Sequence, residues 1–127
     1  MTAKTDGAVA GLLQAFDKVC AVLEQENDFL HAGKVQEVVD LFPKKQKVLA
    51  ALEAILAEGR PTSAAPDQPH PLMTSETEEA AIRFGAQIRR NRELLRQAID
   101  TQNFLIRLIV VDAVQEAGTG YVASGQY

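Results

Sequence analysis

The chain has no tryptophan, one cysteine and two histidines in 127 residues, and these absences argue against several classes of protein. Cys20 has no second cysteine for an internal disulfide, which is typical of a protein of a reducing compartment. His31 and His70 have no metal ligand three or four residues downstream of them, so we expect no metal site. A glycine-rich phosphate loop is also missing. The sequence therefore predicts no cofactor and no enzymatic activity.

Long apolar runs and an excess of positive charge are missing as well. The longest run, Leu108–Val111, is far too short to cross a bilayer. Met1–Gly7 is polar and no uninterrupted apolar segment follows it, so we expect no signal peptide. The net charge of −4 argues against nucleic acid as the main partner. A cytoplasmic protein with a single domain over residues 1–127 is the prediction.

No segment alternates between apolar and polar residues as a strand would, and the patterns that are present are helical. The first predicted helix covers about residues 8–32, and Gly33 ends it. Glu26 and Asn27 interrupt its apolar stripe with polar groups, as residues that set helix register do. The stripe repeats at spacings of three and four residues and consists of Leu12, Phe16, Val19, Leu23 and Leu30.

A second helix is predicted over about residues 34–58, with Gly59 at its end. Pro43 lies inside it, so either a break or a kink is possible. Because the apolar stripe keeps its phase across Pro43, a kink is favoured. The stripe comprises Val35, Val38, Phe42, Lys45, Leu49, Leu52 and Leu56, with Leu41, Val48 and Ile55 on a parallel line. Residues 60–74 hold four of the five prolines and predict an extended, mobile loop.

The third predicted helix, residues 75–117, is the longest. Ser75-x-x-Glu78 resembles a capping box, and neither glycine nor proline occurs between Gly85 and Gly118. A stripe through Ile88, Leu95 and Ala98 continues to Leu105 and Ile109, which we expect to face the other helices. From residue 104 onward, apolar side chains point in nearly every direction. Such a helix must be buried on more than one side, so a partner is needed.

The predicted fold is therefore all-α: a helical hairpin packed along one long C-terminal helix, in a coiled-coil-like antiparallel three-helix bundle. Residues 118–127 are expected to form a flexible tail. The apolar residues that would bind a client helix are those pointing away from the hairpin. They are Phe104, Ile106, Leu108, Val110, Val111 and Val114.

Four arginines form the only basic cluster. They could bind phosphate, but no aromatic residues are interleaved among them to stack bases. We favour a charged face matched by Glu24, Glu37, Glu53 and Glu93, or by an acidic partner. The cluster consists of Arg89, Arg90, Arg92 and Arg96.

Several of these motifs together resemble the FlgN-type flagellar export chaperones. The first half of the resemblance is Leu23-Glu-x-Glu26-Asn-x-x-Leu30 and Leu41-x-x-x-Lys45-x-x-Val-Leu49-x-x-Leu52. The second half is Asn91-x-x-Leu94-Leu95, the apolar run to Val114, and Tyr121-x-x-x-Gly125. The chain departs from the family pattern at Pro43 and in the proline-rich loop.

The resemblance implies a cytoplasmic chaperone of the flagellar type III secretion system. Its clients would be the hook-associated (hook–filament junction) proteins, bound through their C-terminal helical segments and delivered to the export gate at the membrane. The resemblance also implies that Tyr121 and Gly125 of the tail contact the gate. The apolar run is equally compatible with a structural subunit that self-associates into a homodimer, or with an adaptor that has no role in export.

Overall fold

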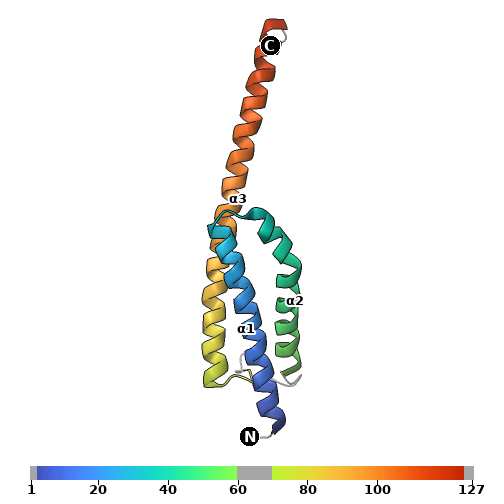
Figure 1. Ribbon diagram of the computed structural model, residues 1–127, viewed down its shortest axis with the longest axis vertical. Coiled ribbons are helices and arrows are strands. Elements are labelled where there is room, and N and C mark those ends of the chain that lie inside the picture. Colours follow the sequence, from blue (N-terminus) through green and yellow to red (C-terminus); the bar gives the residue numbers. More distant parts are fainter. Residues whose placement is uncertain (1–2, 60–69, 125–127) are drawn as a thin grey trace. The chain divides into compact units, whose positions relative to one another are not determined.

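Three α-helices follow one another in this computed structural model: α1 (Ala3–His31), α2 (Val35–Gly59) and α3 (Ser75–Ser124) (Figure 1). The structure describes residues 3–59 and 70–124, and these residues contain no strand. α1 and α2 pack on each other, and both contact the first part of α3. The predicted all-α class and the three-helix bundle are thus confirmed.

The chain divides into two units, Met1–Leu94 and Leu95–Tyr127, and the boundary falls inside α3. The sequence had led us to expect one domain over residues 1–127. The first unit contains the hairpin and the beginning of α3, and all the buried side chains of the described residues belong to it. The second unit is the C-terminal part of α3 and is described separately below.

The turn between α1 and α2 depends on Gly33, whose φ of +72° is the left-handed conformation that only glycine adopts readily. The Gly33 N–H donates to the Leu30 carbonyl at 3.1 Å, and the Lys34 N–H donates to the Phe29 carbonyl at 2.8 Å. This pair of hydrogen bonds is the Schellman motif, which satisfies carbonyls at the end of a helix. The predicted helix end at Gly33 is therefore confirmed.

Replacing Gly33 with alanine is expected to lower the free energy of unfolding by about 1 kcal/mol, because a Cβ is disfavoured at this φ. Gly11→Ala is the matched control, since Gly11 lies inside α1 and an added Cβ would meet no atom within 4 Å. That substitution should stabilise the protein by about 0.5–1 kcal/mol. Urea denaturation of both variants measures the difference, and equal effects would contradict the role of Gly33.

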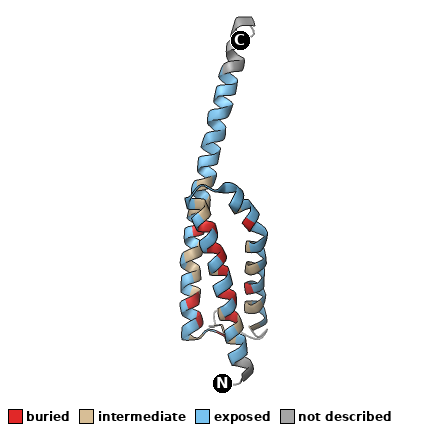
Figure 2. Cartoon of the chain, viewed as in Figure 1, coloured by how far each residue is buried: buried red, intermediate tan, exposed pale blue. Residues whose placement is uncertain are grey.

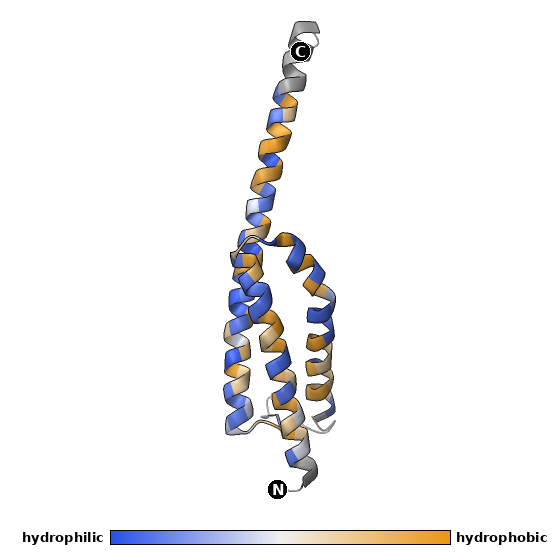
Figure 3. Ribbon diagram, in the orientation of Figure 1, coloured by the Kyte–Doolittle hydropathy of each residue, from blue (hydrophilic) through white to orange (hydrophobic). Residues whose placement is uncertain are grey.

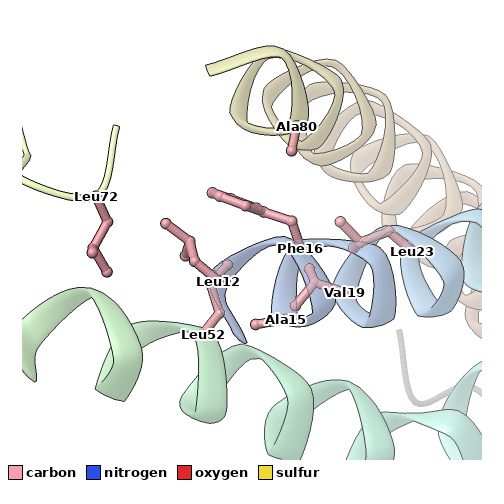
Figure 4. Packing of buried hydrophobic residues seen from close by; sticks show 8 residues of the cluster. All are labelled: Leu12, Ala15, Phe16, Val19, Leu23, Leu52, Leu72 and Ala80. Atoms are coloured by element: carbon pink, nitrogen blue, oxygen red, sulfur yellow. The ribbon is translucent and has the colours of Figure 1, made fainter. Parts of the chain in front are cut away.

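The core is built mainly from the apolar stripe of α1. Leu12, Phe16, Val19 and Leu23 are almost completely buried, as predicted, and Leu30 is half-buried. Figure 4 shows Leu12 and Leu52 between α1 and α2, and Phe16 extending from α1 toward Ala80 of α3. The rest of the cluster consists of Ala15 and Leu72, with Leu49, Ile55, Leu56, Phe84 and Ile88 packed around it. The predicted packing of α1 against α2 is confirmed.

α2 is one continuous helix with Pro43 inside it, so the break, which was the alternative to the favoured kink, does not occur. Figure 1 shows the axis of α2 bending in its first half, as the kink interpretation expects. The buried side of this helix differs from the predicted stripe at two positions. Val35 and Phe42 are exposed, whereas Leu41, on the parallel line, is buried. The inward-facing side of α2 therefore combines residues of both lines: Val38, Leu41, Lys45, Val48, Leu49, Leu52, Ile55 and Leu56.

α3 begins with a hydrogen-bonded cap one residue earlier than the motif predicted from the sequence. The Thr74 N–H donates to the Thr77 hydroxyl at 2.6 Å, and the Thr77 N–H donates to the Thr74 hydroxyl at 3.3 Å. The fully buried Thr77 also donates to the carbonyl of Leu72 at 2.9 Å. Thr74 and Thr77 thus form the reciprocal cap. The prediction that Ser75 and Glu78 form it is wrong.

The remaining helix ends also differ from the predictions. α1 begins at Ala3 rather than near Ala8, and α3 continues to Ser124 rather than ending near Ala117. Residues 118–124 of the predicted tail therefore lie within the helix. Of the predicted proline-rich loop, residues 60–69 lie outside the described residues, as do residues 125–127 of the tail.

Candidate partner-binding surface

The C-terminal unit presents a dense set of exposed apolar side chains. Figure 2 shows exposed residues along this part of α3, and Figure 3 shows many of them to be hydrophobic. The relative exposures of the large apolar side chains range from 47% at Leu108 to 68% at Ile109. The set consists of Ile99, Phe104, Leu105, Ile106, Leu108, Ile109, Val110, Val111 and Val114. Monomeric soluble proteins rarely expose this many neighbouring apolar side chains, and such patches usually mark a site of interaction with a partner.

All six residues predicted to bind a client belong to this exposed set: Phe104, Ile106, Leu108, Val110, Val111 and Val114. Leu105 and Ile109, which we expected to face the hairpin, are exposed to the same degree. The exposed fractions therefore do not separate Leu105 and Ile109 from the six residues predicted to bind a client.

Two residues were predicted to contact an export gate. Tyr121 lies within α3 and Gly125 lies outside the described residues.

A buried polar cluster joins the three helices inside the first unit. The Lys45 ammonium of α2 donates to the Glu26 carboxylate of α1 at 2.8 Å and to the Asn91 side-chain oxygen of α3 at 2.9 Å. The Asn91 side-chain amide donates to Glu26 and, at 2.9 Å, to the Asn27 oxygen. Asn27 in turn donates to Gln87 at 3.1 Å. Within this cluster, Glu26, Asn27 and Asn91 are each less than 5% exposed.

Every buried side-chain donor and acceptor in the described part of the protein has a partner. The cluster is consequently a satisfied network, which fixes how the helices align, rather than a set of groups awaiting a ligand. The sequence signalled three of its members, because the polar residues Glu26, Asn27 and Lys45 lie in otherwise apolar stripes. It did not show that the members of the cluster meet, since that depends on contacts between residues 19 to 65 positions apart.

The arginine cluster does not form the ion pairs that we expected. Arg89, Arg90, Arg92 and Arg96 are exposed, and the ion pairs of the described residues are Lys45–Glu26 and Arg83–Asp17. Among the described residues these arginines thus form no ion pair with the four glutamates, and matching by an acidic partner, the other alternative, stays a prediction. The second pair joins two exposed side chains at 3.9 Å, a geometry that contributes little to stability.

The structure describes the surroundings of Cys20 and His70. Desolvation raises the pKa of the half-buried Cys20 thiol, as do Asp17 and Glu24, while Arg83 acts in the opposite direction. The thiol is thus protonated at neutral pH and a poor nucleophile. His70 bridges two segments, since its Nε2 lies 2.7 Å from the Leu56 carbonyl and its Nδ1 accepts from the Leu72 N–H at 3.1 Å.

Two further searches concern metals and membranes. Residues 3–59 and 70–124 contain no group of three or more His, Cys, Asp or Glu side chains that could hold a metal ion. Within the same ranges, none of the helices combines the length and hydrophobicity needed to cross a membrane.

Comparison of the chain with protein-family models, with curated proteins and with solved structures gave no match.

Proposed function

We propose that this protein is a cytoplasmic export chaperone that binds helical segments of a client protein through the C-terminal part of α3. The observation that carries the proposal is the exposure of the apolar run Phe104–Val114 on a helix. An apolar helix surface is suited to an amphipathic helix of a partner, which buries its own apolar stripe on contact. Binding of this kind keeps both surfaces from aggregating.

The resemblance to FlgN-type chaperones suggests the client class. On this proposal the clients are the hook-associated proteins, which are held unassembled through their C-terminal helical segments. A hydrophobic contact is also compatible with release of the client at the export gate, because the client segment can dissociate from the chaperone without the breaking of a covalent bond. No step in the proposed function requires a cofactor or catalysis.

The proposal is tested by mixing the purified protein with a purified hook-associated protein and measuring the mass of the complex by light scattering. We expect a stoichiometric complex of chaperone and client. The variant carrying both Ile106→Glu and Leu108→Glu should lose at least about a hundredfold in affinity, because each charge would be desolvated without a partner. If the protein instead forms a homo-oligomer whose mass does not change with protein concentration or with added client, it is a structural subunit.

A second experiment separates client binding from delivery to the export gate. Deleting residues 119–127 removes Tyr121 and Gly125 but leaves the apolar run intact. We expect client affinity to stay within about twofold of wild type, since this deletion removes no residue of the proposed client surface. Secretion of the client from cells should fall. Loss of client affinity in the truncated protein would show that these residues belong to the client site instead.

A further inference from the structure

Four arginines lie close together in the first half of α3, within the first unit of the chain. No Asp or Glu occurs between the first and the last of them, and Ala86 is the only other exposed residue of this stretch. The stretch has a charge of +4 and the whole chain has −4, so the remaining residues carry −8. An acidic protein therefore has a short segment of helix whose charged side chains are all cationic. The four residues are Arg83, Arg89, Arg90 and Arg92.

These arginines are hardly neutralised by their own chain. Among the described residues, Arg89, Arg90 and Arg92 form no ion pair. Arg83 lies 3.9 Å from Asp17, but both side chains are largely exposed, and an exposed pair at this distance contributes little. The guanidinium groups are therefore open to an acceptor from another molecule.

Helix periodicity arranges the four arginines in two rows. At about 100° per residue, Arg83 and Arg90 lie within about 20° of each other, and Arg89 and Arg92 lie within about 60°. Ala86 falls between the rows, and its short side chain leaves the space between them open. An acceptor in this space can be reached from both rows. Because a guanidinium presents a planar fork of N–H donors, it matches the two oxygens of a carboxylate.

The cationic region is short, and this limits the kind of partner that fits it. Exposed Glu79 precedes the region and exposed Glu93 follows it. From Arg83 to Arg92 the helix rises by about 14 Å, which equals about four residues of extended chain. A bilayer or a nucleic acid extends much farther and would meet the remaining surface, whose charge of −8 repels it. A short acidic segment contacts the arginines alone.

From this we infer that the exposed side of residues 83–92 is a docking site for a short acidic segment of a partner protein. Glu or Asp carboxylates of the segment accept hydrogen bonds from the arginines of both rows. The site shares no residue with the exposed apolar run Phe104–Val114, so it is a second binding surface that goes beyond the proposed function. Because the contact joins exposed charges, its affinity should fall steeply with increasing salt.

Fluorescence anisotropy at low salt tests the inference with a fluorescent Glu-rich peptide of about eight residues, which is long enough to span the site. We expect the wild-type protein to bind this peptide and to ignore a peptide with glutamine in place of every glutamate. Removing three of the four arginine charges should weaken binding by at least about fivefold. This variant carries Arg89→Gln, Arg90→Gln and Arg92→Gln.

The control removes the same amount of positive charge from exposed lysines of α1 and α2. It should leave the affinity for the peptide within about twofold of wild type. The control carries Lys18→Gln, Lys44→Gln and Lys47→Gln. Both variants change exposed side chains only, so their thermal unfolding should match that of the wild type.

The other outcomes overturn the inference. An equal loss in the control would mean that the peptide responds to net charge and not to this site. Tighter binding to vesicles that contain phosphatidylserine than to the peptide would identify an anionic membrane as the partner, and failure of the wild type to bind the peptide would remove the site altogether. The arginine variant should still bind a hook-associated protein as the wild type does. If it loses that affinity, the arginines belong to the client site, and the proposed function stands without a second surface.

Discussion

Phe16→Ala is expected to lower the free energy of unfolding by about 3–5 kcal/mol, the usual cost of truncating a fully buried phenylalanine. Phe16 is 3% exposed, and its ring centroid lies 5.8 Å from that of Phe84 in a tilted arrangement. The truncation would remove the aromatic contact and leave a cavity between α1 and α3. The loss is a large share of the 5–15 kcal/mol typical of a folded protein. Urea denaturation followed by circular dichroism measures it.

Phe42→Ala is the matched control for this experiment. Phe42 also belongs to an apolar stripe with heptad spacing in the sequence, but its side chain is 51% exposed in the structure. The same substitution should cost less than about 1 kcal/mol there, because little buried area is lost and alanine favours the helix. If Phe42→Ala proved as destabilising as Phe16→Ala, the assignment of the buried side of α2 would be wrong.

Lys45→Met should be similarly destabilising, by about 3–5 kcal/mol, although it replaces a charged residue with an apolar one of similar length. The Glu26 carboxylate is 2% exposed, and Lys45 is its only cationic partner among the described residues. Removing the ammonium would leave a buried charge unpaired and would also leave the Asn91 oxygen without its donor. Chemical denaturation at neutral pH checks the size of the loss.

The double variant Glu26→Gln with Lys45→Met separates the charge from the packing. A glutamine at position 26 removes the unpaired charge while keeping an oxygen that accepts from the Asn91 amide. We expect the double variant to recover more than half of the stability that Lys45→Met loses, because burying a neutral amide costs far less than burying a carboxylate. No recovery would mean that the lysine stabilises the bundle by packing and not by neutralising Glu26.

The candidate surface was predictable from the sequence because its signal is local. Apolar residues occur at nearly every position from Phe104 to Val114, and no helix of this chain could bury them on all sides. We expected Leu105 and Ile109 to face the hairpin and the other apolar residues of this run to point away from it, and this expectation depended on the heptad phase alone. Phase specifies which residues share a side of a helix but not what covers that side. Leu105 and Ile109, with exposures of 51% and 68%, illustrate the difference.

Local sequence patterns were enough to predict the three helices, the turn at Gly33, the core stripe of α1 and the apolar run of α3. Each of these follows from periodicity, glycine conformation or helix propensity within a few residues of chain. The tertiary structure was needed to settle which positions of α2 are buried, because two neighbouring apolar lines run along this helix: Leu41 of one line and Leu52 of the other are buried, whereas Val35 and Phe42 are exposed. It also decided the cap formed by Thr74 and Thr77, in which the Thr77 hydroxyl binds the carbonyl of Leu72, a member of the core. The meeting of Glu26, Lys45 and Asn91 was decided at the same level, because hydrogen bonds between three helices depend on how the helices align and not on the local pattern of any one of them.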